Sequence, residues 1–186
     1  MKDKLKVTVL MDFNCIPDES PDFLDDTIEP TTEYHVVSSL RELGHYVRIC
    51  GVNNNVAAIV HELSDNKPDM VFNLVEQFRD DRRMDRHVAG LLELMNIPFT
   101  GTGSLGLMLG RNKGLCKQLL RPRKIRVPEF IVVPLGRKVR IPKSLPYPLV
   151  VKPLFEDGSD GISRSSLVKD EKELLDRARM VHDKFR

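Results

Sequence analysis

Apolar and polar positions follow a regular order along the first half of the chain. Short apolar runs of strand length occur at residues 5–11, 46–52, 69–75 and 97–100. Between them, apolar side chains recur at the three- and four-residue spacing of a helix face, at residues 33–43, 56–63 and 88–95. This order predicts an α/β domain with a parallel sheet covered by helices. The loops that follow the strands, where open α/β sheets bind ligands, should share one edge.

Local signals support two of the predicted helices. Gly44 follows the first helix, as expected of a C-terminal glycine, and residues 53–55 (NNN) offer N-caps to the second. Pro68 ends the second unit of this pattern. The third strand, DMVFNLV, shows little polar alternation, which is typical of a strand buried on both faces.

The pattern changes after Gly101, because strands are now separated by turns rather than by long helices. Two short helices should meet near Gly110, and strands should follow; the expected ranges are 104–109 and 112–120 for helices, and 129–133, 148–152 and 163–168 for strands. Asp170 and Glu173 form a capping-box-like start for a last helix. We therefore predict an α+β unit with antiparallel strands, and two domains that cover residues 1–103 and 104–186.

Composition narrows the classes of partner. The chain has 29 Lys and Arg residues against 27 Asp and Glu, so its total charge draws it neither to nucleic acid nor to an anionic membrane. Residues 12–33 carry acidic side chains and no Lys or Arg, and residues 12–30 of this stretch should form a long loop. Residues 111–126 are basic, but they have no interleaved aromatic side chain for stacking bases. We therefore expect no nucleic-acid partner and no membrane partner.

The cysteines and histidines show no spacing of a metal site or a nucleophile. Cys15, Cys50 and Cys116 are odd in number and far apart, which argues against a disulfide framework. The amino terminus has too short an apolar run for a signal peptide, and no stretch is long enough to span a membrane. These features predict a cytoplasmic protein.

The most informative stretch is residues 147–163, YPLVVKPLFEDGSDGIS. Lys152 ends an apolar run, where its charge is costly to bury without an anion to pair with it. Residues 156–161 follow as an acidic loop, and Gly158 and Gly161 allow its backbone to approach a ligand closely. A cation next to an amide-donating loop predicts a polyphosphate clamp. The alternative is a plain strand–turn–strand hairpin whose glycines serve turn geometry.

Three further motifs carry weaker signals. Residues 101–106 match the dinucleotide pattern G-x-G-x-x-G, but they follow the fourth strand and lack a downstream acid for the ribose, so we reject a nicotinamide-dependent oxidoreductase. Lys113, in the first turn of a helix, is a second lysine of interest, and the alternative is a solvated helix lysine. Glu76 follows the third strand near Asn73 and Asp85, and is either a contact to a substrate amine or a polar loop residue.

Four blocks in order resemble the D-alanine–D-alanine ligase group of the ATP-grasp superfamily: VFNLVEQF, HVAGLLELMNIPFTGTGSLGLMLGRNK, VPEFIVV and VVKPLFEDGSDGIS. The resemblance implies a pre-ATP-grasp domain at residues 1–103 and an incomplete ATP-grasp central subdomain at residues 104–186. It also implies that Lys113 and Lys152 hold the phosphates of ATP. Residues 156–161 would form a lid that closes over these phosphates. The nucleotide-binding residues expected besides the two lysines are Glu156, Asp157, Gly158, Ser159 and Gly161.

The chain departs from this family in several places. Residues 11–15 (MDFNC) stand where the ligases carry G-G-x-S-x-E, which puts D-alanine specificity in doubt. Gln77, Asn112 and Gly158 replace a glycine, an aspartate and a serine of the family pattern. The sequence ends before the family's carboxyl-terminal domain, so the magnesium ligands are expected outside this chain.

The resemblance implies an ATP-dependent carboxylate–amine ligase that forms a peptide-like bond through an acylphosphate. Its substrates would be a small carboxylate and an amine, and its first domain could supply a homodimer contact. We expect the full-length protein to be an enzyme and these 186 residues alone to be inactive, because phosphoryl transfer relies on metal neutralisation. The alternative is a non-catalytic nucleotide-binding or interaction module derived from an ATP-grasp protein.

Overall fold

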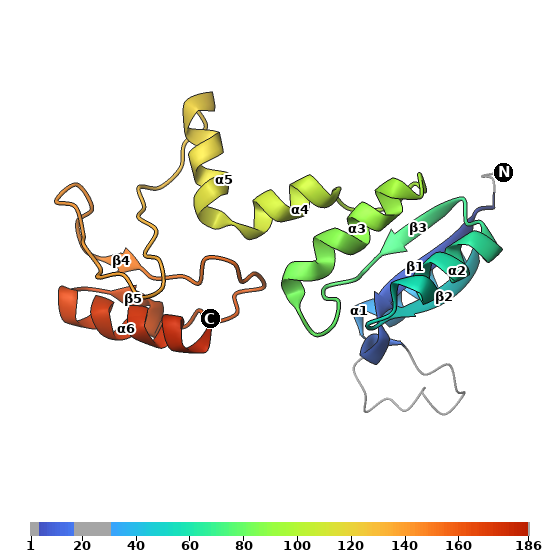
Figure 1. The fold of residues 1–186 in the computed structure, drawn as a ribbon, viewed down its shortest axis with the longest axis horizontal. Helices are drawn as coiled ribbons and strands as arrows, with labels where there is room; N and C mark the ends of the chain where they lie inside the picture. The colour runs from blue at the N-terminus through green and yellow to red at the C-terminus, as the bar shows by residue number, and fades with distance from the viewer. Residues whose placement is uncertain (1–3, 17–30, 186) are drawn as a thin grey trace. The chain divides into compact units, whose positions relative to one another are not determined.

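The computed structural model describes residues 4–16 and 31–185, which form two compact units, Met1–Leu107 and Met108–Arg186. The regular elements of the first unit are labelled in Figure 1. They are β1 (Lys6–Asp12), α1 (Thr32–Glu42), β2 (Tyr46–Val52), α2 (Val56–Asn66), β3 (Met70–Asn73) and α3 (Asp85–Leu94). This unit also contains 3-10 turns at Phe13–Cys15 and Arg82–Met84. Most of the acidic loop predicted at residues 12–30 lies outside the described residues.

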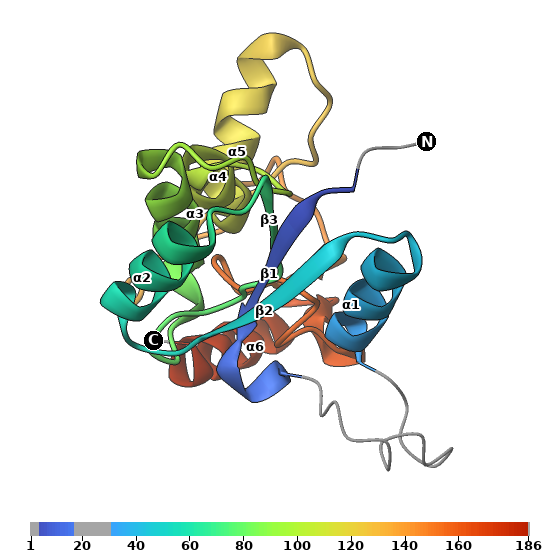
Figure 2. The same cartoon turned by 90° about the vertical axis from the view of Figure 1, so that its right-hand side faces the viewer.

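The first unit is built around a parallel sheet of order β2-β1-β3, as the strand–helix alternation predicted. Its central strand β1 is covered on both faces (Figure 2). Val7, Val9 and Met11 pack with Val37 of α1, whereas Leu10 packs with residues of α2 and α3 on the opposite face. The period-two alternation of side chains along β1 therefore feeds two separate apolar clusters.

The prediction of a fourth strand at residues 97–100 is wrong in its extent, because the segment forms only an isolated bridge. The segment makes a single parallel bridge between Val71 and Phe99, in which Val71 N donates to Pro98 O at 2.8 Å and Thr100 N donates to Val71 O at 3.0 Å. Pro98 has no backbone N–H, so the ladder of hydrogen bonds cannot extend through it. The third strand has both of its faces covered, as predicted, because Val71 joins one apolar cluster while Phe72 packs against the other.

The second unit has fewer strands than the sequence predicted. Its elements are the end of α4 (Ser104–Arg111), α5 (Lys113–Leu120), β4 (Leu149–Val150), β5 (Leu167–Val168), α6 (Glu171–Lys184), and 3-10 turns at Arg121–Arg123 and Arg164–Ser166. β4 and β5 pair antiparallel, as expected. Residues 129–133 form no strand; Pro128 and Pro134 bracket them, and the carbonyl of Val133 is bound by His182 Nε2 at 3.1 Å instead.

Helix ends in the second unit follow from local side chains. α4 and α5 are separated at Asn112 rather than at Gly110, because the Asn112 side chain caps α5 by accepting from Leu115 N at 3.0 Å. The predicted start of α6 is confirmed: Asp170 accepts from Glu173 N at 2.9 Å, and the Glu173 carboxylate accepts from Lys169 N at 2.7 Å. Within the described residues, no helix combines the length and apolar character needed to cross a membrane.

The buried thiol of Cys50 should resist alkylation in the native protein. Burial raises its pKa from 9.0 to about 11, which lowers its thiolate fraction by about 100-fold, and the thiolate is the reactive form. In a Cys15→Ser/Cys116→Ser variant, we expect native protein to react with a thiol reagent at least about tenfold more slowly than protein unfolded in guanidinium. Equal rates in the two states would show that Cys50 is exposed.

Candidate functional site

Lys113 joins the start of α5 to the loop after β4 through two hydrogen bonds. Lys113 N donates to Leu154 O at 3.3 Å, and Lys113 Nζ donates to the backbone carbonyl of Glu156. Gly114 permits this approach, because a Cβ there would lie 2.7 Å from Val132 Cγ2 and 3.4 Å from Leu154 Cδ1. The first turn of α5 therefore sets the ammonium group of Lys113 against the first residue of the lid.

The electrostatics of Lys113 connect it to Lys152. Burial lowers the pKa of Lys113 below 10.5, and the positive charges of Lys152 and Arg111 lower it further. The carboxylates of Asp157 and Glu156 act in the opposite direction. The two predicted lysines, 39 positions apart in the sequence, are thus close enough in space to repel each other. A cluster of cations with a lowered lysine pKa is the environment expected of an anion site.

Residues 156–161, the predicted lid, form a tight turn. Gly158, Ser159 and Gly161 all have positive φ angles, of 54°, 64° and 69°. Asp160 N donates to Asp157 O at 2.9 Å, and Ile162 N donates to Ser159 O at 3.0 Å. Glycine suits position 161 for a second reason, because a Cβ there would collide with the ring of Phe185 and lie 2.9 Å from Pro153 Cγ.

Two buried arginines hold this loop, and the sequence singled out neither of them. Arg111 Nη2 lies 3.6 Å from Asp157 Oδ2. Arg177 of α6 donates to Ser166 Oγ at 2.7 Å and to Ser165 Oγ at 3.1 Å, and its Nη2 also binds Gly161 O. A signal for Arg177 existed: it falls on the apolar face of α6 between Leu174 and Val181, where a charged side chain needs partners.

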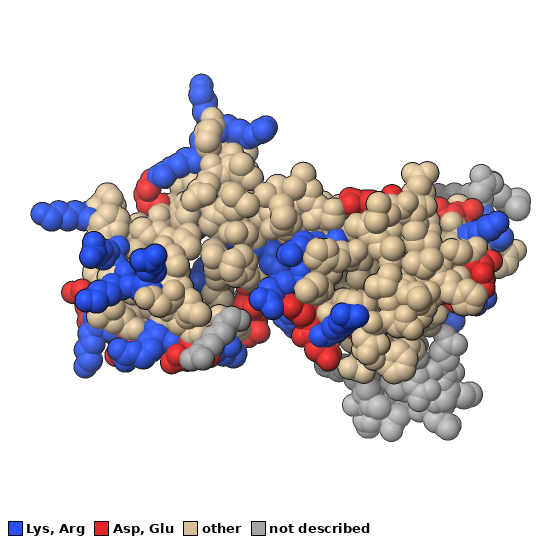
Figure 3. Space-filling view, in the orientation of Figure 1, with Lys and Arg blue, Asp and Glu red and all other residues tan. Residues whose placement is uncertain are grey.

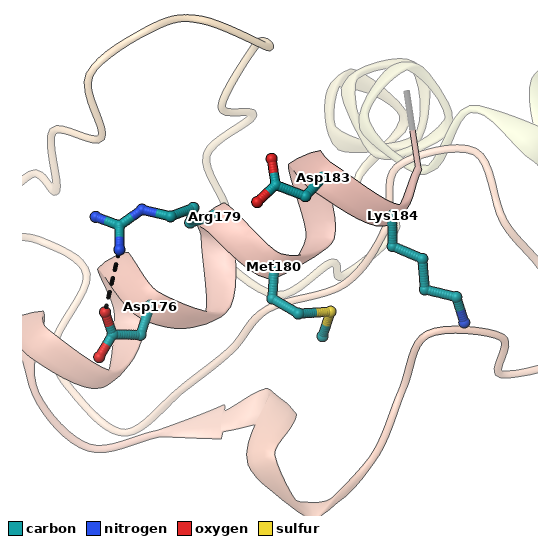
Figure 4. A pocket seen from close by; sticks show the side chains of 5 residues that line it. All are labelled: Asp176, Arg179, Met180, Asp183 and Lys184. Carbon is teal, nitrogen blue, oxygen red and sulfur yellow. Dashed lines mark ion pairs between the residues drawn. The ribbon is translucent and has the colours of Figure 1, made fainter.

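The basic side chains of the second unit are otherwise spread over its surface. Figure 3 shows Lys and Arg side chains projecting near the end of α5 and around the β4–β5 pair. A hollow along α6 is lined by Asp176, Arg179, Met180, Asp183 and Lys184 (Figure 4). One helix supplies the whole lining of this hollow, and Lys113, Lys152 and residues 156–161 are not part of it. This hollow is therefore not the candidate site. Lys184 Nζ, however, contacts Asp160 Oδ1 of the lid at 3.3 Å.

The sheet edge of the first unit uses its polar groups internally. Asp12 Oδ1 accepts from Glu76 N at 3.3 Å and from Gln77 N at 3.4 Å, and burial raises the pKa of Asp12. Asn73 Oδ1 accepts from Val75 N at 3.2 Å, and the Asp85 carboxylate is bound by Arg86 N at 2.6 Å. The Glu76 carboxylate is exposed, 4.0 Å from the nearest nitrogen of Arg82, so Glu76 alone of the three predicted residues presents its side chain outward.

The glycine motif at residues 101–106 is occupied by protein groups. Glu93 accepts from Ser104 N at 3.1 Å and from Ser104 Oγ at 2.6 Å, so a carboxylate already caps the start of α4, where a dinucleotide would place its pyrophosphate. A Cβ at Gly103 would collide with Glu93, and one at Gly106 with Thr102. These glycines serve packing of the chain against itself.

Metal-ligating side chains do not gather in the described part of the chain. Across residues 4–16 and 31–185, no group of three or more His, Cys, Asp or Glu side chains is placed to hold an ion. The two carboxylates beside the clamp, Glu156 and Asp157, face cations instead.

Curated proteins similar to this chain are mainly D-alanine–D-alanine ligases. That of Rhizorhabdus wittichii is 33% identical over 128 residues, which are 69% of this chain and 39% of the ligase. That of Syntrophotalea carbinolica is 46% identical over 91 residues, 48% of this chain and 28% of the ligase. An uncharacterised Sinorhizobium fredii protein, y4sG, is 30% identical over 81% of this chain and 44% of its own length. No protein-family model matches the chain.

A solved structure shares the fold. The D-alanine–D-alanine ligase of Bacillus anthracis, crystallised with ATP, superposes with a TM-score of 0.64 at 20% identity, covering 97% of this chain and 55% of that one. The predicted fold class, a parallel-sheet α/β unit followed by a unit with an antiparallel pair, is confirmed by this match. The chain spans about two fifths of the length of the Rhizorhabdus and Sinorhizobium proteins.

Proposed function

The chain is D-alanine–D-alanine ligase-like, with an ATP-grasp fold over part of a ligase's length, and we propose from this that it is the nucleotide-binding part of an ATP-dependent carboxylate–amine ligase. In this proposal the first unit is the pre-ATP-grasp domain and the second is the central subdomain. The observation that carries it is the meeting of Lys113, Lys152 and the lid.

In the proposed reaction, a substrate carboxylate oxygen attacks the γ-phosphorus of ATP, and the bond to the β-phosphate oxygen breaks to release ADP. An amine then attacks the acylphosphate carbon and releases phosphate, giving a peptide-like bond. Lys113 and Lys152 would hold the nucleotide phosphates, and the lid would exclude water from them. Magnesium would neutralise phosphate charge in such a reaction, but no group of three or more ligating side chains gathers among the described residues, so the contacts proposed for this chain are those of its side chains alone.

The residues present suit a polyphosphate. Lys152 is a second cation that acts electrostatically on Lys113, and the carboxylates of Glu156 and Asp157 act on Lys113 in the opposite direction. A nucleotide triphosphate carries about three to four negative charges near neutral pH, by the same acidity that gives a phosphate group its second pKa near 6, so both lysines can pair with it. Glu76 is proposed to face the amine substrate, because its carboxylate is exposed at the end of β3.

Calorimetric titration of the 186-residue chain with ATP tests the binding step. We expect ATP to bind, and adenosine to bind more weakly by about tenfold or more because it lacks the phosphates that the lysines contact. Release of ADP by the full-length protein, measured with pairs of small carboxylates and amines that include D-alanine, tests the ligase itself. ATP binding without ADP release for any pair would favour the non-catalytic module, and equal affinity for adenosine and ATP would contradict the phosphate clamp.

Affinity for ATP should fall at alkaline pH because of Lys113. Its pKa is lowered in the free protein, and bound phosphate would raise it again, so binding takes up a proton as pH rises through the lowered pKa. Affinity is therefore highest at a pH where Lys113 is protonated in both the free and the ATP-bound protein. It should begin to decline at a pH below 10.5, the ordinary pKa of lysine. Titrations at rising pH check this.

Lys113→Arg is the matched control for this pH dependence, because guanidinium keeps its charge throughout the range. Its affinity for ATP should lose the part of the alkaline decline that Lys113 causes. An identical decline in the wild type and in Lys113→Arg would assign the titration to another group.

A further inference from the structure

Arg111, the last residue of α4, carries a buried charge. The proposed phosphate clamp, which consists of Lys113, Lys152 and the lid, does not use this charge. Only 8% of its side-chain surface is exposed. A guanidinium does not lose its proton in a protein, so burial cannot neutralise it as it could a lysine. Its charge also acts on Lys113, whose pKa it lowers. Two cations held this close, one of them permanent, require an anion beside them.

One anion beside Arg111 comes from the lid. Asp157 Oδ2 lies 3.6 Å from Arg111 Nη2, which is an ion pair but longer than a charge-assisted hydrogen bond of about 2.7–2.9 Å. The side chain of Asp157 is 61% exposed, so the carboxylate can turn away into water at little cost. The lid thus places a well-solvated carboxylate in loose contact with a buried cation.

The loop geometry makes Asp157 replaceable as a partner. It stands in the turn that contains Gly158 and Ser159, both at positive φ, and its backbone carbonyl, rather than its carboxylate, accepts the hydrogen bond that closes the turn. Losing the ion pair therefore leaves that turn bond intact. A phosphate oxygen could take the place of the carboxylate beside Arg111, and a guanidinium binds phosphate through two parallel hydrogen bonds.

We propose that Arg111 is a third phosphate-binding cation of this site and that Asp157 is an internal anion which the polyphosphate displaces from it. This rests on the proposed function in so far as the polyphosphate is that of ATP. The proposal predicts opposite effects of Arg111 and Asp157 on nucleotide affinity. Arg111 strengthens nucleotide binding, whereas Asp157, although it belongs to the lid, competes with the nucleotide.

Calorimetric titrations with ATP and with inorganic tripolyphosphate test the proposal. Asp157→Asn should bind both ligands about three- to tenfold more tightly than the wild type, because the competing charge is gone. Arg111→Gln should bind both about tenfold more weakly, and Arg111→Lys should fall between. Asp157→Asn added to Arg111→Gln should bring a smaller gain in affinity than Asp157→Asn alone, since only the effect of the carboxylate on Lys113 is then removed.

Asp176→Asn is the matched control. Asp176 has the same exposed fraction, 61%, and an arginine at 3.7 Å, but this partner, Arg179, lies on the same helix and is itself exposed (Figure 4). Its replacement should change affinity by less than about twofold. Circular dichroism and thermal unfolding verify that Arg111→Gln is folded. If Arg111→Gln does not fold, Asp157→Asn still tests the proposal, because Asp157 is exposed.

The outcomes separate this proposal from the proposed function. Unchanged or weaker binding by Asp157→Asn, or wild-type affinity in folded Arg111→Gln, overturns the role of Arg111 and leaves ATP binding standing. Tripolyphosphate binding with the predicted pattern, but no ATP binding, contradicts the nucleotide function and keeps the anion site. Failure of the wild type to bind either ligand overturns both.

Discussion

Replacing Lys152 with alanine should lower the affinity of the chain for ATP by about 10- to 100-fold, because a hydrogen bond to a charged group contributes about 1.5–3 kcal/mol. Lys152 is exposed just beyond β4, so its removal should not disturb folding. It also acts electrostatically on Lys113, and both amino groups are proposed to meet the same phosphates. Calorimetric titration with ATP at fixed ionic strength measures the loss.

Two controls give this result its meaning. Lys172→Ala removes an equally charged, exposed side chain from α6 and should change ATP affinity by less than about twofold. Adenosine affinity should be nearly the same in Lys152→Ala and in the wild type, since adenosine has no phosphate to lose contact with. Wild-type ATP affinity in Lys152→Ala, or an equal loss in Lys172→Ala, would refute a specific phosphate contact.

Leu92→Ala should destabilise the first unit by about 2–5 kcal/mol, which is a large part of the roughly 5–15 kcal/mol that keeps a typical domain folded. Leu92 is 0% exposed and belongs to the apolar cluster that joins α3 to Leu10 of β1 and Leu63 of α2. The smaller side chain would leave a cavity between helix and sheet. Urea unfolding followed by circular dichroism measures the change.

The same helix offers a matched control two residues away. Leu94 is 88% exposed, so Leu94→Ala removes the same atoms from water-facing surface and should change the free energy of unfolding by about 0.5 kcal/mol or less. Equal effects of the two substitutions would mean that α3 does not pack through the face that contains Leu92.

The sequence predicted the first unit well because its signals are local. Strand length, helical spacing and caps such as Asn55, which accepts from Ala58 N at 3.3 Å, act within a few residues of each other. The strands of the second unit were harder to predict. The apolar run at residues 129–133 reads as a strand, but pairing needs a neighbour with free backbone groups, and that is a property of distant segments.

The candidate site shows the same limit. Lys152 and the lid were recognisable because a lysine, two glycines and acidic residues are adjacent in the sequence. Lys113 could be linked to them only through the family resemblance, since its contacts with Leu154 and Glu156 span about forty residues. Arg111 looked like one more basic residue of a charged stretch, because burial is set by packing and leaves no mark at the residue itself.

The central claim is that Lys113 and Lys152 converge on one polyphosphate. The most direct measurement is the pKa of the Lys113 side chain by NMR, with its resonance assigned by its absence from Lys113→Arg. The account predicts a pKa below 10.5 in the free wild type, a higher pKa in Lys152→Ala, and a higher pKa again when ATP is added to the wild type. A Lys113 pKa that responds neither to Lys152→Ala nor to ATP would contradict it.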